Sequence, residues 1–178
     1  MKKFILLLTT TIISCSVFPQ LSVAKMIGKY SKEYKIGFGA FYTISIPLNE
    51  TGNQSVSLEL FDIEYFPVKP SSYLTDGGGF ASFKVGYRHI FSEESATGFF
   101  VEPQAGFCMT AVGPETGDYG KGLALALITG YSLEVGQRGN SFIFGLKYEA
   151  DLGSMNKQIH SIGLRVAFNY SMFGGGRF

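Results

Sequence analysis

The sequence has no tryptophan, two cysteines and few charged residues, since Asp, Glu, Lys and Arg together make up 16% of its 178 residues. The formal net charge of +1 excludes the strong positive field that recruits nucleic acid, so no nucleic-acid partner is expected. Beyond the N-terminal segment no apolar run approaches the roughly 20 residues of a membrane-spanning helix. The length indicates a single domain. The missing apolar run excludes a membrane protein built from helices, but not one built from strands.

The first 24 residues follow the plan of a secretory signal peptide. The basic pair Lys2-Lys3 precedes an apolar run, and Ser22-Val23-Ala24 offers small residues at positions −3 and −1 of a cleavage site. We therefore expect a signal peptide over 1–24 and one domain over 25–178. The stretch Ile12-Ile13-Ser14-Cys15 also resembles the box before a lipidated cysteine, and whether Cys15 is lipidated or incidental stays open.

Alternation of apolar and polar residues is the strongest pattern in the rest of the chain. In FFVEPQAGF, Phe99, Val101 and Phe107 fall on one face of a strand, whereas Glu102 and Gln104 fall on the other. The same period recurs in segments separated by turn-like connections rich in Gly, Pro, Asn and Asp. These segments are 34–46, 55–66, 80–91, 98–110, 122–134, 141–152 and 159–172.

Three positions in these segments carry more specific expectations. The apolar phase changes within 55–66, which predicts a bulge near Leu60-Phe61, because one extra residue reverses the facing of a strand. Pro103 lacks an N–H, which predicts a bulge or a strand end at that point. Tyr34 shares the apolar phase of its segment and is expected on the apolar face.

The character of the two faces indicates which one points inward. The apolar faces are large and aromatic, with tyrosines often toward the segment ends, whereas the polar faces mix Gly, Ala and Ser with single charges. Small residues suit the crowded interior of a narrow barrel, and lipid solvates an aromatic exterior. We predict an all-β fold, a closed antiparallel up-and-down transmembrane β-barrel of about eight strands. The alternative is a soluble or lipid-anchored periplasmic barrel whose apolar face lines the interior and binds an apolar ligand.

This facing divides the predicted site residues into two groups. A polar lumen is expected to hold a charge network of Lys84, Arg88, Glu102, Lys147, Glu149 and Arg165. Lipid is expected to contact Phe99, Val101, Phe107, Leu125, Phe144, Leu164 and Phe168. A hairpin centred on 93–95 places Arg88 directly opposite Glu102 on the lumen face.

The stretches FFVEPQAGF, FGLKYEA and SIGLRVAF resemble late strands of the porin-family outer-membrane β-barrel domain, the small OmpA-like barrels of Gram-negative bacteria. The resemblance covers roughly residues 34–173. It implies eight strands, no cofactor, a place in the cell outer membrane and outer-membrane lipid as a partner. The last strand is also similar to the signal read by barrel-assembly machinery, a second implied partner. The residues that carry this assembly signal are Ser161, Gly163, Val166 and Phe168.

The chain departs from the family pattern in two ways. A tail over 174–178 follows the last strand, whereas such barrels often end on the strand itself. Only seven strands are clear, although bacterial barrels have an even strand number with both ends in the periplasm. We therefore expect residues 25–33, or a segment that begins before Lys25, to hold a poorly patterned eighth strand.

The sequence carries no convincing catalytic or metal-binding set. His89 and His160 lack convergent ligand partners, and His160-Ser161 point to opposite faces of a strand, so they cannot form a catalytic pair. Glu149 and Asp151 share the inner face with Lys147, which favours a structural ion network over an acid–base pair. No metal, cofactor or catalytic residue is therefore expected.

The expected function is a non-enzymatic outer-membrane role, either structural, in surface interaction or in minor passage of small solutes. An eight-stranded barrel is filled by its own side chains, which disfavours a wide pore. The loops expected to carry an interaction, with a ligand the sequence leaves unknown, are 68–79, 111–120 and 153–158. The alternative is an enzyme on the same fold that modifies envelope lipid, which requires a Ser/His/acid cluster at one rim.

Overall fold

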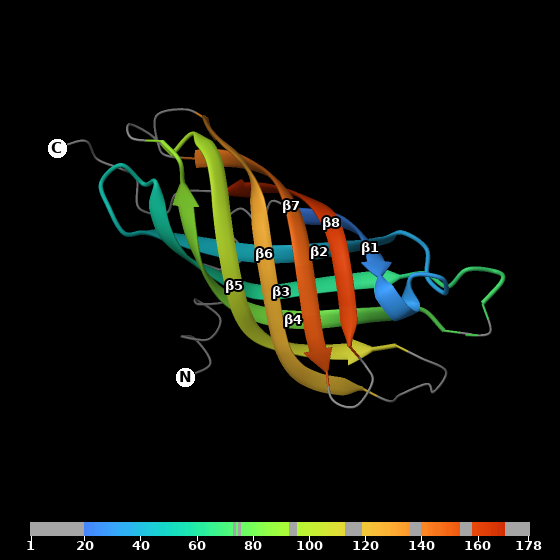
Figure 1. The fold of residues 1–178 in the computed structure, drawn as a ribbon. Helices are drawn as coiled ribbons and strands as arrows, with labels where there is room; N and C mark the ends of the chain where they lie inside the picture. The colour runs from blue at the N-terminus through green and yellow to red at the C-terminus, as the bar shows by residue number, and fades with distance from the viewer. Residues whose placement is uncertain are drawn as a thin grey trace, which may run out of the picture.

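The chain forms one closed sheet of eight antiparallel strands. The computed structural model describes residues 20–72, 74, 76–92, 96–112, 119–135, 140–153 and 158–169. The strands are β1 Gln20–Ile27, β2 Gly37–Pro47, β3 Gln54–Phe66, β4 Gly78–Ile90, β5 Gly98–Ala111, β6 Gly120–Val135, β7 Asn140–Gly153 and β8 Ile159–Asn169, and a 3-10 turn, η1 Gly28–Tyr30, follows β1. Each strand pairs with its neighbours in sequence, and β1 pairs with β8 to close the barrel (Figure 1).

The predicted closed antiparallel up-and-down barrel is therefore confirmed. Each alternating segment corresponds to one of the strands β2 to β8, with ends that differ by a few residues. Odd-numbered strands run from one end of the barrel, here called the turn end, to the other, here called the loop end, where η1 lies (Figure 1). Within the described residues, no helix is long and apolar enough to cross a membrane.

The predicted eighth strand is confirmed, and it begins before Lys25. β1 begins at Gln20, inside the segment predicted as signal peptide, and ends at Ile27. Gly28 then adopts a positive φ of 74°, which breaks the extended chain and lets η1 form. This early break keeps the alternation of β1 short, which is why the pattern alone does not predict a strand at these residues.

β1 closes the barrel by pairing on both of its edges. Its pairs with β2 run from Gln20↔Phe41 to Ala24↔Gly37, and its pairs with β8 from Leu21↔Val166 to Ile27↔His160. At the seam with β8, a Cβ atom on Gly163 would lie 2.7 Å from the Cβ atom of Ala24. The glycine is therefore needed for the two strands to approach each other here.

The predicted bulge in β3 is confirmed. Tyr42 pairs with Phe61, whereas the next residue of β2, Thr43, pairs with Glu59, so Leu60 is the extra residue. The β3–β4 ladder also shifts, between Glu59 and Asp62. The bulge lets Leu60 and Phe61 both stay on the outside while the acidic side chains on either side of them point inward.

The expectation of a bulge or strand end at Pro103 is wrong. β5 continues from Gly98 to Ala111, and Pro103 pairs in register with Leu127 of β6. On the other edge the ladder with β4 is interrupted between the pairs Gly86↔Gln104 and His89↔Val101, without a change of register. The missing proline N–H therefore costs pairing on one edge only, and the second ladder keeps the strand continuous.

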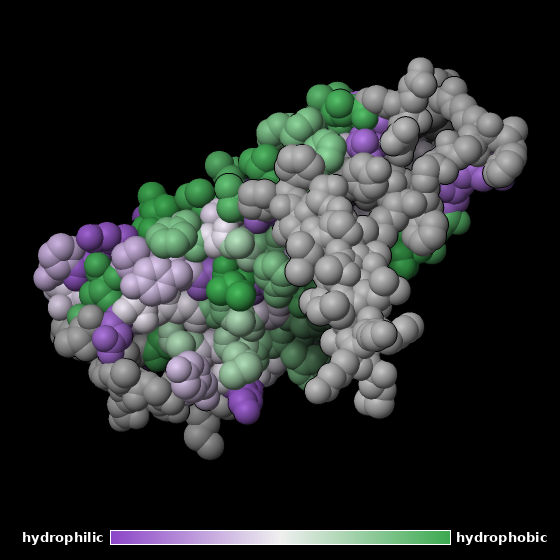
Figure 2. Space-filling model, turned by 180° about the vertical axis from the view of Figure 1, so that it is seen from behind, coloured by the Kyte–Doolittle hydropathy of each residue, from purple (hydrophilic) through white to green (hydrophobic). Residues whose placement is uncertain are grey.

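The barrel is apolar outside and polar inside. Large apolar side chains are exposed along its outer wall, as far as 76% for Phe107 and 64% for Leu164. Figure 2 shows one such face, with apolar side chains spread along the flank of the barrel. The soluble alternative required the apolar face to line the interior, and the structure places it on the exterior instead.

The lumen is not polar throughout, because it also contains two apolar layers that were not predicted. The loop-end layer contains Met26, Tyr34, Phe66, Phe80 and Ile159, among others. The turn-end layer contains Phe41, Ile90, Phe100, Ile128, Ile143 and Ala167. Tyr34, expected on the outer face, is 1% exposed and belongs to the loop-end layer, because its segment leaves the strand and bridges to Val68. The charges lie between these layers.

Candidate functional site

The middle of the lumen holds a dense set of buried charges. Among the described residues, six acidic and four basic side chains are buried there: Glu59, Asp62, Glu64, Glu102, Glu149, Asp151, Lys84, Arg88, Lys147 and Arg165. All of them project from inward positions of β3, β4, β5, β7 and β8. Burying such charges is costly unless each is paired, so their contacts decide whether the barrel is stable.

Lys147 of β7 contacts acidic groups on two strands. Its Nζ lies 2.9 Å from Asp62 Oδ2 and 2.6 Å from Glu64 Oε1, both on β3. It also lies 2.6 Å from Glu149 Oε2 on its own strand. Because β3 and β7 are not neighbours in the barrel, these ion pairs cross the lumen.

Two further bases make similar links. Lys84 of β4 lies 3.0 Å from both Glu59 and Asp62 and also pairs with Glu149 across the lumen. Arg165 of β8 places Nη2 2.7 Å from Glu59 Oε2. Strands on opposite sides of the barrel are thus joined through its centre by charge-assisted contacts. The network fills the space that a channel would need.

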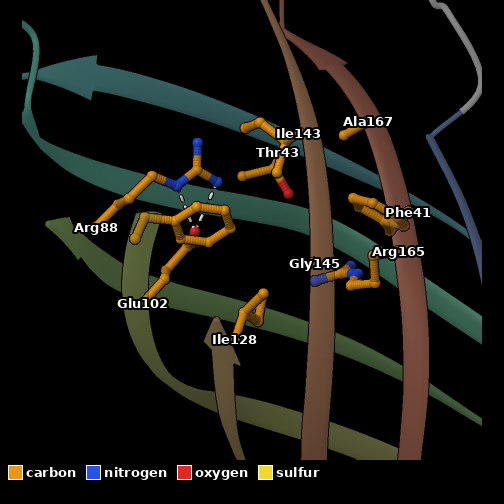
Figure 3. Close-up of a pocket in the computed structure, with 10 residues that line it drawn as sticks. Phe41, Thr43, Arg88, Glu102, Ile128, Ile143, Gly145, Arg165 and Ala167 are labelled. Atoms are coloured by element: carbon orange, nitrogen blue, oxygen red, sulfur yellow. Dashed lines mark hydrogen bonds and ion pairs between the residues drawn. The ribbon is translucent and has the colours of Figure 1, made fainter. Parts of the chain in front are cut away.

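Arg88 and Glu102 form a separate pair near the turn end. Arg88 Nε donates to Glu102 Oε2 at 2.6 Å (Figure 3). Gln104 Nε2 donates to Glu102 Oε1 at 2.8 Å. The guanidinium also lies 5.1 Å from the centre of the Phe100 ring. A cavity of about 20 Å³ adjoins the pair, which is room for about one water molecule.

The structure brings the predicted lumen residues inside the barrel. Lys84, Lys147, Glu149 and Arg165 belong to one network, whereas Arg88 and Glu102 pair with each other. Phe99, Phe107, Leu125, Phe144 and Leu164 are exposed on the outer wall, and Val101 and Phe168 are half-buried there. Of the predicted assembly signal, Ser161 and Gly163 point inward, whereas Val166 and Phe168 point outward.

Three acidic residues of the network are absent from the set predicted by sequence. Glu59, Asp62 and Glu64 are each 2% exposed or less and contact three of the four buried bases. The bulge hides them, because it places Glu59 and Asp62 three residues apart on one face, where a regular strand would put them on opposite faces. When the apolar–polar alternation is followed separately before and after the bulge, it assigns all three acidic side chains to the inward face.

The two histidines contact aromatic residues. His160 Nδ1 lies 3.0 Å from the hydroxyl of Tyr148, on the outer side of the barrel. His89 packs edge-on against Phe91, with ring centres 4.9 Å apart. Within the described residues, no group of three or more His, Cys, Asp or Glu side chains could hold a metal ion.

The buried pair near the turn end leads to a testable prediction. Glu102→Ala is expected to lower the free energy of unfolding by about 3–5 kcal/mol, because Arg88 would be left buried without its partner. The double change Arg88→Met, Glu102→Leu is expected to cost less, because it strands no charge. A double-mutant cycle in detergent, followed by urea unfolding, measures the coupling, and a coupling energy of zero would contradict the prediction.

No protein-family model matches the chain, and no curated protein matches it. Among solved structures, the chain is similar to the crystal structure of Ail, the attachment invasion locus protein of Yersinia pestis. The identity is 14% and the TM-score 0.41, over 84% of this chain and 93% of that chain. A likeness this distant carries no argument about function. The chain is placed among closed eight-stranded antiparallel β-barrels by its own strand order and register.

Proposed function

We propose that the protein is an integral β-barrel of a Gram-negative outer membrane, with a non-enzymatic role in envelope structure and surface interaction. The observation that carries this proposal is the distribution of side chains, with apolar residues exposed on the wall of the barrel and charged residues buried inside it. Leu125, Phe144 and Leu164 are 40%, 51% and 64% exposed on the wall, whereas Lys147 and Glu149 are fully buried inside. Lipid is the solvent that stabilises such an exterior, and closure satisfies every strand edge within it.

The tyrosines of the outer wall support the same proposal. Tyr65 and Tyr148 lie in the loop-end halves of β3 and β7, and Tyr87 and Tyr131 lie in the turn-end halves of β4 and β6. All four are between 38% and 47% exposed. Amphipathic rings prefer the two interfaces of a membrane, and girdles of aromatic residues are typical of outer-membrane barrels.

The filled lumen favours a structural role over the passage of solutes. Ion pairs cross the centre of the barrel, and an apolar layer lies on each side of them. A solute would have to break contacts that are buried and charge-assisted. We therefore place the function in the barrel wall and in the loops.

An ordered platform at the loop end supports a role in surface interaction. The backbone N–H of Lys69 donates to the carbonyl of Glu33 at 2.8 Å, and Ser72 Oγ donates to Glu33 Oε2 at 2.6 Å. Tyr34 also bridges to Val68. These contacts join the β1–β2 and β3–β4 connections into one surface, which suits a partner outside the cell. The barrel-assembly machinery is the proposed partner during biogenesis, through β8.

Fractionation tests the proposed location. We expect the protein to stay with the outer-membrane fraction through salt washing and to be released by detergent. The folded barrel should also migrate differently on a gel before and after boiling. A protein that is released without detergent and shows no heat-dependent shift would contradict the proposal.

Arginine on the outer wall should destabilise the inserted barrel. Leu125→Arg, Phe144→Arg and Leu164→Arg are each expected to destabilise the barrel, because the charge enters hydrocarbon. The cost is expected to be largest, about 2–4 kcal/mol, for Leu164 in the middle of β8, and smaller toward the two ends of the barrel. Leu48→Arg is the matched control, since Leu48 is 55% exposed but lies beyond the end of β2. Reversible unfolding in lipid vesicles provides the measurement. Equal stabilities for Leu125→Arg and Leu48→Arg would show that the wall does not face lipid.

A further inference from the structure

Charge on the outer wall is confined to the loop end. Among the described strand residues, the outward positions carry two charged side chains, Lys25 of β1 and Lys121 of β6. Lys25 is three residues from the end of β1, and Lys121 is the second residue of β6, so both lie near the same rim. Their partners across the ladder are apolar, Ile162 for Lys25 and Met109 for Lys121.

The β1–β2 connection adds three exposed bases above this wall. Lys29, Lys32 and Lys35 are all exposed, and Lys29 Nζ lies 5.3 Å from the centre of the Tyr30 ring. The acidic residue between them, Glu33, is engaged by Ser72. Together with Lys25 and Lys121, these three lysines are here called the basic collar. Asp76 is the exposed acidic residue described at this end, so the lysines outnumber it.

The turn end has the opposite character. The exposed or half-exposed charged side chains described there are acidic, Glu50 beyond β2 and Glu134 at the end of β6. Arg88, the nearest base, points into the lumen and is paired with Glu102. Among the described residues, exposed charge is therefore mainly basic at the loop end and acidic at the turn end.

We propose that the two wall lysines of the basic collar, Lys25 and Lys121, bind the phosphate groups of lipid headgroups in the leaflet that surrounds the loop end. This inference rests on the proposed membrane location and adds a ligand class and an orientation to it. A lysine on an apolar wall lays its methylene stem along the hydrocarbon and raises its ammonium group to the headgroups. There each ammonium is a point charge that pairs with phosphate.

The position of the two wall lysines favours a lipid headgroup over a soluble anion as their ligand. Lys25 and Lys121 project from the strands themselves, among side chains such as Ile27 and Leu123 that are 36% and 45% exposed. A headgroup in the surrounding leaflet reaches this height of the wall. A soluble anion or protein would meet Lys29, Lys32 and Lys35 on the connection above. The two groups of lysines can therefore be tested separately.

The test uses the full-length exported protein, purified folded in an uncharged detergent. Its retention of bisphosphorylated lipid A is measured by native mass spectrometry against phosphatidylcholine, with and without inorganic phosphate as competitor. A lysine near an anionic lipid surface contributes about fivefold to affinity. We expect the Lys25→Gln, Lys121→Gln double variant to lower the preference for lipid A by about 25-fold, and inorganic phosphate to leave it almost unchanged.

Two controls separate charge from folding. Lys25→Arg, Lys121→Arg keeps the charge and should keep the preference, whereas Glu50→Gln, Glu134→Gln alters the other rim and should not change it. A heat-dependent gel shift shows that each variant is folded. An unchanged preference in the Gln variant, or loss caused only by changing Lys29, Lys32 and Lys35, would overturn the inference. A protein that needs no detergent would instead overturn the proposed membrane location.

Discussion

A chain that begins at Lys25 will fail to close the barrel, whereas a chain that begins at Gln20 will fold. Every pair in the β1–β2 ladder uses a residue between Gln20 and Ala24. Gln20 also accepts a hydrogen bond from the backbone N–H of Thr43, at 2.9 Å from its Oε1 atom. Without the residues from Gln20 to Ala24, β2 has no partner on one edge.

We expect the shortened chain not to fold at all, because a barrel with an unpaired strand edge is unstable in lipid. Each backbone group left without a partner in hydrocarbon costs several kcal/mol, and only helices and closed barrels avoid this. Refolding from urea into detergent, read by the heat-dependent gel shift, tests the prediction. The chain that begins at Gln20 is the matched control. A shifted band for the chain that begins at Lys25 would contradict the role given to β1.

The β1–β2 ladder also bears on the predicted signal peptide. A signal peptide that ends at Ala24 would remove the whole β1–β2 ladder. We therefore expect cleavage upstream of Gln20, where Ser14-Cys15-Ser16 offers small residues at both cleavage positions. Intact-mass measurement of protein from the outer membrane gives the mature N-terminus. A folded protein that starts at Lys25 would refute this expectation.

Replacing Lys147 by methionine is expected to lower the free energy of unfolding by about 3–5 kcal/mol. Methionine keeps much of the volume of the side chain but removes the charge that lies 2.6 Å from Glu64 Oε1. Asp62 and Glu149 retain Lys84, whereas Glu64 makes no other ion pair within the described residues. The cost therefore comes largely from a buried carboxylate without a counter-charge.

Compensation distinguishes this electrostatic cause from a packing defect. Adding Glu64→Gln to Lys147→Met should recover part of the lost stability, because the stranded charge is removed. Lys25→Met is the control for the substitution itself, since Lys25 is exposed on the outer wall and should cost little. Urea unfolding in detergent provides the comparison. A double variant as unstable as Lys147→Met alone would assign the effect to packing.

Local sequence patterns are sufficient to predict much of the fold. A period of two places successive side chains on opposite faces, so alternation assigns Phe107 and Leu125 to one side of the wall and Glu149 to the other. A short hairpin sets its own register, which is why the spacing around residues 93–95 is enough to place Arg88 opposite Glu102. Both inferences depend on residues that are close together in sequence.

The remaining features depend on closure of the barrel, which no local pattern encodes. Lys147 meets Asp62 and Glu64 because β3 and β7 face each other across the lumen, although more than 80 residues separate them in sequence. β1 is recognisable as a strand only because β2 and β8 both offer it an edge. Its alternating residues by themselves are too few to distinguish a strand from the end of a signal peptide.

The sequence by itself thus determined the strands β2 to β8, the facing of most of their side chains and the placement of apolar residues on the wall and charged residues in the lumen, because alternation is a property of the local chain. The tertiary structure decided which charges meet, where the apolar layers lie and which residues close the barrel. Those contacts form between strands that only closure brings into range, and their geometry depends on how side chains of different size fill one narrow interior.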